Sequence, residues 1–182
     1  MNYRRYSFDV PFGAIAENLV NTLDESIAVP EHLVTPADVG KFLGVHGIEW
    51  PRKPTVSDLE EVRVLRARVR VLFVATTQVE AERRLNELLA DVKLKMRVAR
   101  QGGVARIEWE VDDSVALVDA IRSAVAVSAA HVARDLGFER LRVCGADPCA
   151  DVFLDVSKRG EQKFCGPKCA TRVRVAAHRA RQ

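Results

Sequence analysis

Apolar residues in the first three quarters of the chain recur three and four positions apart, which is the period of amphipathic helices. Residues 57–60 (Ser-Asp-Leu-Glu) and 77–80 (Thr-Gln-Val-Glu) have the spacing of capping boxes, which mark helix starts. Pro36 after Thr35 indicates another start, because proline suits the first helical turn. The pattern therefore predicts helices over residues 14–22, from 35 to about 44–47, over 57–73, over 77–89 and over about 115–136.

Residues 93–99 and 104–111 instead alternate between apolar and polar side chains, which predicts two half-buried strands. Between them lies Gln-Gly-Gly at 101–103, whose glycines permit the positive φ of a tight turn. Asp112, Asp113 and Ser114 offer N-caps to the last helix of this region, and Gly137 ends it. We therefore expect residues 1–139 to form a mainly helical domain with one β-hairpin, an α+β fold.

All four cysteines fall in the last forty residues. Cys144 and Cys149 are separated by four residues, Cys165 and Cys169 by three, and fifteen residues lie between the pairs. Two short knuckles of this kind, rich in glycine and proline, are typical of structural zinc sites. The alternatives are two disulfides, unconnected buried thiols or a redox switch. Because the rest of the chain lacks cysteine and shows no secretory leader, we predict one structural zinc ion in a finger of residues 140–182.

A helix is predicted behind the second knuckle, because residues 168–181 contain no glycine or proline. At about 100° per residue, one side gathers Cys169, Val173, Ala176, Ala177 and Ala180, which is expected to be the packed face. The other side is basic. A solvated charged face is one explanation, and neutralisation of the zinc thiolates is a second for the cations nearest the cysteines. We predict nucleic-acid contacts for the whole basic set: Lys168, Arg172, Arg174, His178, Arg179 and Arg181.

The formal charge of +3 is unevenly distributed. Residues 140–182 contain ten Lys or Arg and four Asp or Glu, which gives +6 and leaves −3 for residues 1–139. A basic end on a mildly acidic body indicates an anionic partner for the finger. Within the body, the predicted helix at 57–73 has four arginines that are interpreted as solvated or paired with Glu60, Glu61 and neighbouring residues rather than as ligand-binding: Arg63, Arg66, Arg68 and Arg70.

Neither a membrane protein nor an enzyme is indicated. The chain is 48% hydrophobic, yet no apolar run reaches the roughly eighteen residues of a membrane span. Asp9, Glu17 and Asn18 interrupt the first twenty residues, which therefore lack the core of a signal peptide, and a cytoplasmic protein is expected. Motifs for nucleophilic catalysis, phosphate binding and zinc proteolysis are absent, and four thiolates leave zinc no open position. No catalytic residues are assigned.

Residues 141–181 contain R-x-C-x4-C, then Val-Phe-Leu-Asp at 152–155, Ser157, and F-C-x3-C-A-T-R before an Arg- and Ala-rich helix. This segment resembles the CGNR zinc finger of bacterial proteins. Asn-Leu-Val-Asn-Thr at 18–22 and the order of helices and hairpin are similar to the ABATE domain that precedes this finger. The resemblance implies zinc ligation by the four cysteines, and DNA binding through Arg172 and the basic face of a stress-associated transcription regulator. The naming tetrapeptide reads Cys-Ala-Thr-Arg at 169–172, so its Gly and Asn are replaced.

The first hypothesis is a DNA-binding transcriptional regulator whose body forms a homodimer or senses an effector. The second is a protein-interaction module, in which the finger docks a partner protein and the cations are a solubilising rim. RNA binding is third, because Phe153 and Phe164 are the aromatic residues of the finger and both are expected to cover the zinc site. The sequence leaves open the DNA sequence recognised, the regulated genes, the effector and the oligomeric state.

Overall fold

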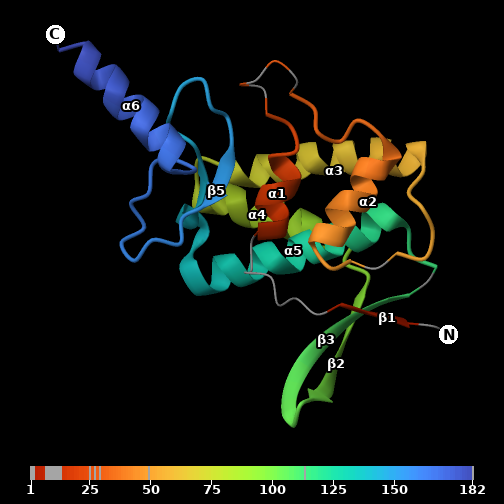
Figure 1. Cartoon of the computed structure of the whole chain (residues 1–182). Coiled ribbons are helices and arrows are strands. Elements are labelled where there is room, and N and C mark those ends of the chain that lie inside the picture. The colour runs from red at the N-terminus through yellow and green to blue at the C-terminus, as the bar shows by residue number, and fades with distance from the viewer. Residues whose placement is uncertain are drawn as a thin grey trace.

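The computed structural model describes residues 3–6, 14–24, 26, 28, 30–48, 50–112 and 114–181. Helices form most of the body, and a three-stranded antiparallel sheet extends from it (Figure 1). The helices of the body are α1 (Ala14–Val20), α2 (Pro36–Val45), α3 (Val56–Phe73), α4 (Gln78–Leu89) and α5 (Leu117–Leu136). The sheet has the order β1 (Tyr3–Tyr6), β3 (Val104–Asp112), β2 (Leu94–Gln101). The finger adds the 3-10 helix η1 (Phe138–Arg140), strands β4 (Leu141–Val143) and β5 (Val152–Leu154), and helix α6 (Pro167–Arg179). A mainly helical α+β fold with a small cysteine module is confirmed.

Helix α5 lies at the centre of the body, where it packs against α1, α3 and α4. Its apolar residues point in nearly all directions, and Leu117, Ile121 and Val125 are fully buried. The burial expected from its Ala- and Val-rich composition is therefore confirmed. None of the described helices is long and apolar enough to cross a membrane.

Two predicted helix starts were wrong. The cap of α3 is Thr55, whose backbone N–H donates to the Asp58 carboxylate at 2.7 Å, and not Ser57. Both positions fit the capping pattern, but Arg52 also binds Asp58, with an Nη1–Oδ2 distance of 2.5 Å, and this fixes the earlier start. Helix α5 begins at Leu117 after Ala116, with no side-chain cap. Asp112 ends β3 and Asp113 lies outside the described residues, so the predicted acidic cap of α5 is not formed by Asp112.

The predicted hairpin is confirmed, with its turn at Gly102 (φ 59°) and Gly103 (φ 85°). In Figure 1 it extends away from the helices. A third strand was not predicted: β1 pairs with β3, Tyr3 opposite Asp112 and Tyr6 opposite Trp109. Four residues without clear alternation are too short to indicate a strand by pattern, so only pairing with a distant segment defines β1.

The arginines of α3 do not pair with Glu60 or Glu61 in the described part of the chain. Arg66 binds Glu31 through two contacts of 2.6 Å, and its guanidinium lowers the pKa of that carboxyl below its ordinary value. Arg63 donates to the backbone carbonyl of Leu33 at 2.7 Å. Arg70 donates to the carbonyl of Ala150 at 3.0 Å, in the finger. Arg63, Arg66 and Arg70 therefore tie α3 to distant segments, and of the four arginines Arg68 is the one that is exposed.

The finger begins within the hydrophobic core of the body. β4 and β5 are antiparallel, with Leu141 opposite Leu154 and Val143 opposite Val152. Leu141 and Val152 belong to the main buried cluster, and Val152 has no exposed surface. A second, smaller cluster forms around Cys144, Ala146 and Cys169. The strand pair therefore holds the cysteine module against the body.

Candidate metal centre and basic helix

The four cysteines converge on one point. Cys144 follows β4, Cys149 lies in the loop before β5, Cys165 precedes α6, and Cys169 is in its first turn. Their sulfur atoms all lie within 4.8 Å of one another. The Sγ–Sγ distances are 3.8 Å from Cys149 to Cys165 and 3.6 Å from Cys165 to Cys169. Tetrahedral zinc with bonds of about 2.3 Å requires sulfurs about 3.8 Å apart, whereas a disulfide requires about 2.05 Å. All four residues are free cysteines, so the predicted convergence is confirmed and the disulfide alternative is not realised.

Backbone hydrogen bonds shape the two knuckles. In the first, the Cys149 amide donates to the Ala146 carbonyl at 2.7 Å. The knuckles are joined where the Gly145 amide donates to the Lys163 carbonyl at 2.9 Å. A Cβ at Gly145 would lie 3.3 Å from that oxygen, so the close approach favours glycine. The Cys165 amide also donates to the Cys144 sulfur at 3.4 Å, which is the contact expected to stabilise a thiolate ligand.

The pKa shifts of the thiols support the presence of a cation among the four sulfur atoms. Burial and the neighbouring thiols raise the pKa of Cys149 to about 12, and they also raise the pKa of Cys165. Burial opposes ionisation of Cys144 too, but the amides of Cys165 and Ala146 donate to its sulfur and lower its pKa. Four sulfurs this close cannot all ionise without a compensating charge. Zinc supplies that charge and prefers a four-thiolate shell, so the donor set fits one structural zinc ion.

Arg172 lies against the metal centre. Its guanidinium donates to the Ala146 carbonyl at 3.0 Å and approaches the Cys169 sulfur to 3.5 Å. It therefore links the first turn of α6 to the first knuckle, and places positive charge beside a shell that carries a net charge near −2 with zinc bound. The explanation that this cation neutralises the site is supported for Arg172. A nucleic-acid contact by the same side chain stays a prediction.

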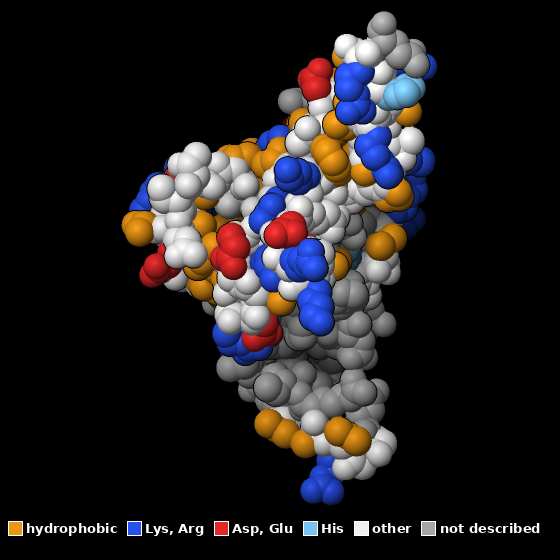
Figure 2. All heavy atoms as spheres, turned by 90° about the vertical axis from the view of Figure 1, so that its left-hand side faces the viewer, with side chains coloured by type: hydrophobic (Ala, Val, Ile, Leu, Met, Phe, Trp, Pro, Cys, Tyr) orange, Lys and Arg blue, Asp and Glu red, His pale blue; other side chains and the backbone are white. Residues whose placement is uncertain are grey.

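Helix α6 projects from the body into solvent (Figure 1). Cys169 is its one buried residue, Val173 is half-buried, and every residue from 174 to 181 is exposed. The predicted packed face therefore ends after the second turn, because the body does not extend far enough to cover Ala176, Ala177 and Ala180. Figure 2 shows Lys and Arg side chains along this projecting end of the molecule. The exposed basic set comprises Lys168, Arg172, Arg174, His178, Arg179 and Arg181.

The domain composition follows from comparison with known families. Residues 13–136 match the ABATE family, described as "Putative stress-induced transcription regulator". The chain belongs to the ABATE family. Residues 140–182 match the CGNR zinc finger. These are regulator and zinc-finger families rather than enzyme families, and no curated protein matches the chain.

The geometry explains what the retained residues of the CGNR tetrapeptide do in this chain. Cys169 supplies one of the four clustered sulfurs, and Arg172 is the side chain that reaches the opposite knuckle. Ala170 and Thr171, which replace Gly and Asn, lie between them and are half-buried and exposed respectively. The metal centre therefore needs the first and last positions of the motif. Thr171 faces outward, and neither Ala170 nor Thr171 belongs to the cysteine cluster.

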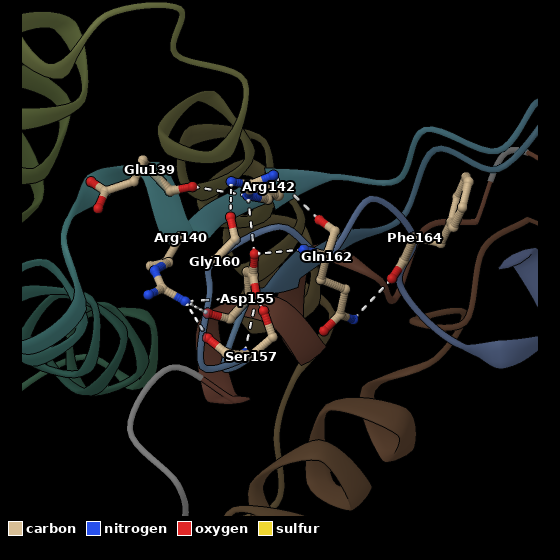
Figure 3. A network of polar contacts seen from close by, with 8 residues as sticks. All are labelled: Glu139, Arg140, Arg142, Asp155, Ser157, Gly160, Gln162 and Phe164. Atoms are coloured by element: carbon tan, nitrogen blue, oxygen red, sulfur yellow. Dashed lines mark hydrogen bonds and ion pairs between the residues drawn. The ribbon is translucent and has the colours of Figure 1, made fainter.

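A buried carboxylate organises the loop that leads to Cys165 (Figure 3). Asp155 is 0% exposed. Its Oδ1 accepts from the Ser157 amide at 3.0 Å and its Oδ2 from the Gln162 amide at 2.9 Å. Arg140 approaches the same carboxylate to 3.8 Å and Arg142 to 3.5 Å. Burial opposes ionisation of Asp155, but these hydrogen bonds and Arg142 lower its pKa below the ordinary value of 3.8.

The two arginines of this network also bind backbone carbonyls. Arg140 donates to Ser157 at 2.6 Å, and Arg142 donates to Gly160 at 2.6 Å and to Gln162 at 3.3 Å. Both arginines contribute to the net positive charge of residues 140–182, but in the structure they bind the backbone of the loop between β5 and Cys165. Two features of the sequence could have indicated this network. Arg140 and Arg142 alternate beside a β-strand, and Asp155 is a single acidic residue among apolar ones.

The Asn-Leu-Val-Asn-Thr segment of the ABATE domain forms the joint with the finger. The Asn21 side chain donates to the Val152 carbonyl and accepts from the Val152 amide, both at 2.8 Å, so it pairs with β5 as a strand would. Glu17 accepts from the Leu154 amide at 3.1 Å. Burial raises the pKa of Glu17, against the effect of that hydrogen bond. Sequence reasoning used this segment only for family resemblance and missed its contact with the finger.

Asn21→Ala should destabilise the protein by about 1–3 kcal/mol, because it leaves the Val152 amide and carbonyl without partners. Chemical denaturation measures the loss, and hydrogen exchange at the Val152 amide should accelerate. Asn18→Ala, at an exposed position of α1 three residues before Asn21, is the control and should change stability by less than about 0.5 kcal/mol. Equal effects of the two substitutions would contradict the assigned joint.

Proposed function

We propose that this protein is a cytoplasmic DNA-binding transcriptional regulator without catalytic activity of its own. The zinc centre fixes the start of α6, and the distal part of the helix contacts the phosphate backbone. Residues 1–139 and residues 140–182 are the two functional parts of the protein. The first contains the ABATE domain, which serves as a sensory or dimerisation domain. The observation that supports this most is the exposure of residues 174–181, which contain Arg174, Arg179 and Arg181 and no acidic residue.

The exposed distal part of α6 has little to stabilise it in the free protein, because helical stability in proteins comes mainly from packing of an apolar face. The distal turns of α6 carry only positive charge, so they fit a polyanion in both charge and shape. DNA would repel the net negative charge of residues 1–139, so the finger would be the part of the molecule that approaches DNA. Arg140 and Arg142 are bound to Asp155 and backbone carbonyls, so the proposed contacts are assigned to α6.

The structure supports RNA recognition by base stacking less well. Phe153 is 2% exposed and lies within the fold, while Phe164 packs on the cysteine cluster. Phe153 is too buried to stack on bases, and the half-buried Phe164 is a single ring rather than a platform for successive bases. The protein-interaction alternative is favoured by one observation, the uncovered apolar side of α6 beyond Val173, where Ala176, Ala177 and Ala180 are exposed. Its salt response separates it from DNA binding, since apolar docking persists in high salt.

Replacing Arg174, Arg179 and Arg181 together by alanine should weaken binding to genomic DNA fragments and reduce the salt dependence of log K by about 3, roughly one per phosphate contact. Gel-shift titrations at several salt concentrations measure both effects. A body variant with Lys53, Arg68 and Arg100 replaced by alanine changes the net charge equally, removes exposed cations elsewhere and should keep the slope. No retardation of DNA by the unaltered protein at low salt would refute the proposal, as would equal losses in the two variants.

A further inference from the structure

A cavity of about 580 Å³ lies where the ABATE domain meets the finger. Cavities that bind small organic molecules measure about 300–1,000 Å³ and commonly form at domain interfaces. Its wall on the body side comes from the end of α3, the following turn and the first turn of α4. Its wall on the finger side comes from η1, β4 and the loop before Cys165. A molecule bound here would contact both parts of the chain at once.

The floor of the cavity is apolar and the walls include aromatic rings. Leu72, Phe73 and Ala81 reach it from the main core, where each is almost fully buried. Phe138 and Phe164 are half-buried and line it from the finger side. Such a surface is suited to an aromatic ring or a branched apolar group, because it removes apolar area of the ligand from water at a site that is already formed.

One charge at the rim has no counterpart. Arg142 is balanced by Asp155, 3.5 Å away. The Glu139 carboxylate folds back over the backbone of Gly137, and Figure 3 shows it pointing away from Arg142 and Phe164. Lys163 is exposed and forms no ion pair with any residue in the described ranges. The N-terminus of α4 already carries a carboxylate in its first turn, because Glu80 accepts from the Thr76 amide at 3.2 Å, so Lys163 is the cation at the rim assigned to the anion.

We propose that this cavity binds a small organic anion, an aromatic or branched apolar group with one carboxylate that pairs with Lys163. Two lining residues are next to zinc ligands in the sequence: Gly145 follows Cys144, and Phe164 precedes Cys165. The bound anion would therefore contact both knuckles that fix the start of α6. It is a small-molecule site separate from the basic helix, and its occupancy alters the finger through these neighbours of the metal centre.

The test compares two probes of nearly equal shape, naphthalene-1-acetate and its neutral amide, on the zinc-loaded full chain. Calorimetry measures affinity, and amide chemical shifts locate the site. The carboxylate should bind more tightly, with shifts at Gln78, Gly145 and Lys163. Equal affinities for the two probes would overturn the assignment of an anion site. Shifts confined to α6 would also overturn it, because they would mean non-specific attraction to the basic helix.

Variants in the finger complete the test. Lys163→Gln should weaken carboxylate binding about fivefold, while amide binding stays unchanged. Lys158→Gln removes an exposed lysine of the same loop that does not line the cavity, and it should have no effect. Val143→Trp, at a partly exposed lining position, should block both probes while zinc content stays at about one per chain. Equal effects of the two lysine variants would refute the proposal. None of these measurements uses DNA, so the result is independent of the proposed function.

Discussion

Cys165→Ser should abolish stoichiometric zinc binding and unfold the region from the first knuckle to α6. Cys165 lies between the other sulfurs, 3.8 Å from Cys149 and 3.6 Å from Cys169, so its loss opens the shell. Structural zinc contributes about 10–16 kcal/mol of apparent binding free energy in zinc-finger peptides, which is free energy of folding for a unit with so small an apolar cluster. Metal analysis should fall from about one zinc per chain to almost none.

Loss of order should be local. The helical body has its own core, and β4 and β5 remain packed on it through Leu141 and Val152. Amide spectra should therefore lose dispersion for α6 while the signals of α5 persist. Val156→Ser is the control, because Val156 is 72% exposed in the same finger.

One competing ligand has to be excluded. The Asp151 carboxylate lies 3.5 Å from the Cys165 sulfur and could replace it as a ligand in the variant. The double variant Cys165→Ser with Asp151→Asn removes that route. Retention of zinc and of an ordered α6 in the double variant would contradict the four-thiolate centre.

Asp155→Ala should destabilise the protein by about 3–5 kcal/mol, the range for removal of one partner from a buried ionic network. The substitution leaves Arg140 and Arg142 close together without their carboxylate, with side chains 17% and 31% exposed. It also removes the acceptor for the amides of Ser157 and Gln162. Denaturant unfolding measures the loss, and amide exchange should accelerate over residues 157–162.

Two further variants define the cause. Asp155→Asn keeps one acceptor oxygen but not the charge, so its stability should fall between those of the unaltered protein and Asp155→Ala. Glu161→Ala removes an exposed carboxylate from the same loop and should change stability by less than about 0.5 kcal/mol. Zinc content should remain near one per chain in all of them, because the sulfur ligands are intact. Asp155→Ala with unchanged stability would contradict a structural role for the network.

The structure refines the role of the basic residues in the finger. Residues 140–182 contain ten Lys or Arg, yet Arg140 and Arg142 bind Asp155 and the loop carbonyls, and Arg172 binds the first knuckle. A charge count therefore overstates the cations available to a partner. The proposed DNA contact rests on the side chains beyond Arg172, which the zinc centre and Arg172 direct away from the body.

Features with a local physical cause could be predicted from the sequence. Helix periods, the Gly102–Gly103 turn and the helix end at Gly137 depend on residues close in the chain, and the structure has them near the expected positions. The four cysteines were equally clear, because short knuckles bring ligands together whatever the body does. Competing local signals caused the errors in caps: Ser57 and Thr55 both fit the pattern, and Arg52 decides between them.

The sequence by itself determined a helical body, a hairpin and a four-sulfur metal centre followed by a basic helix, because each depends on spacing within one segment. Only the tertiary structure decided that Asn21 pairs with Val152, that Arg66 binds Glu31 and that Asp155 gathers Arg140 and Arg142. It also decided where the apolar side of α6 loses its cover, after Val173. These contacts join residues far apart in the chain or depend on how far the body extends, and neither is encoded in local periodicity.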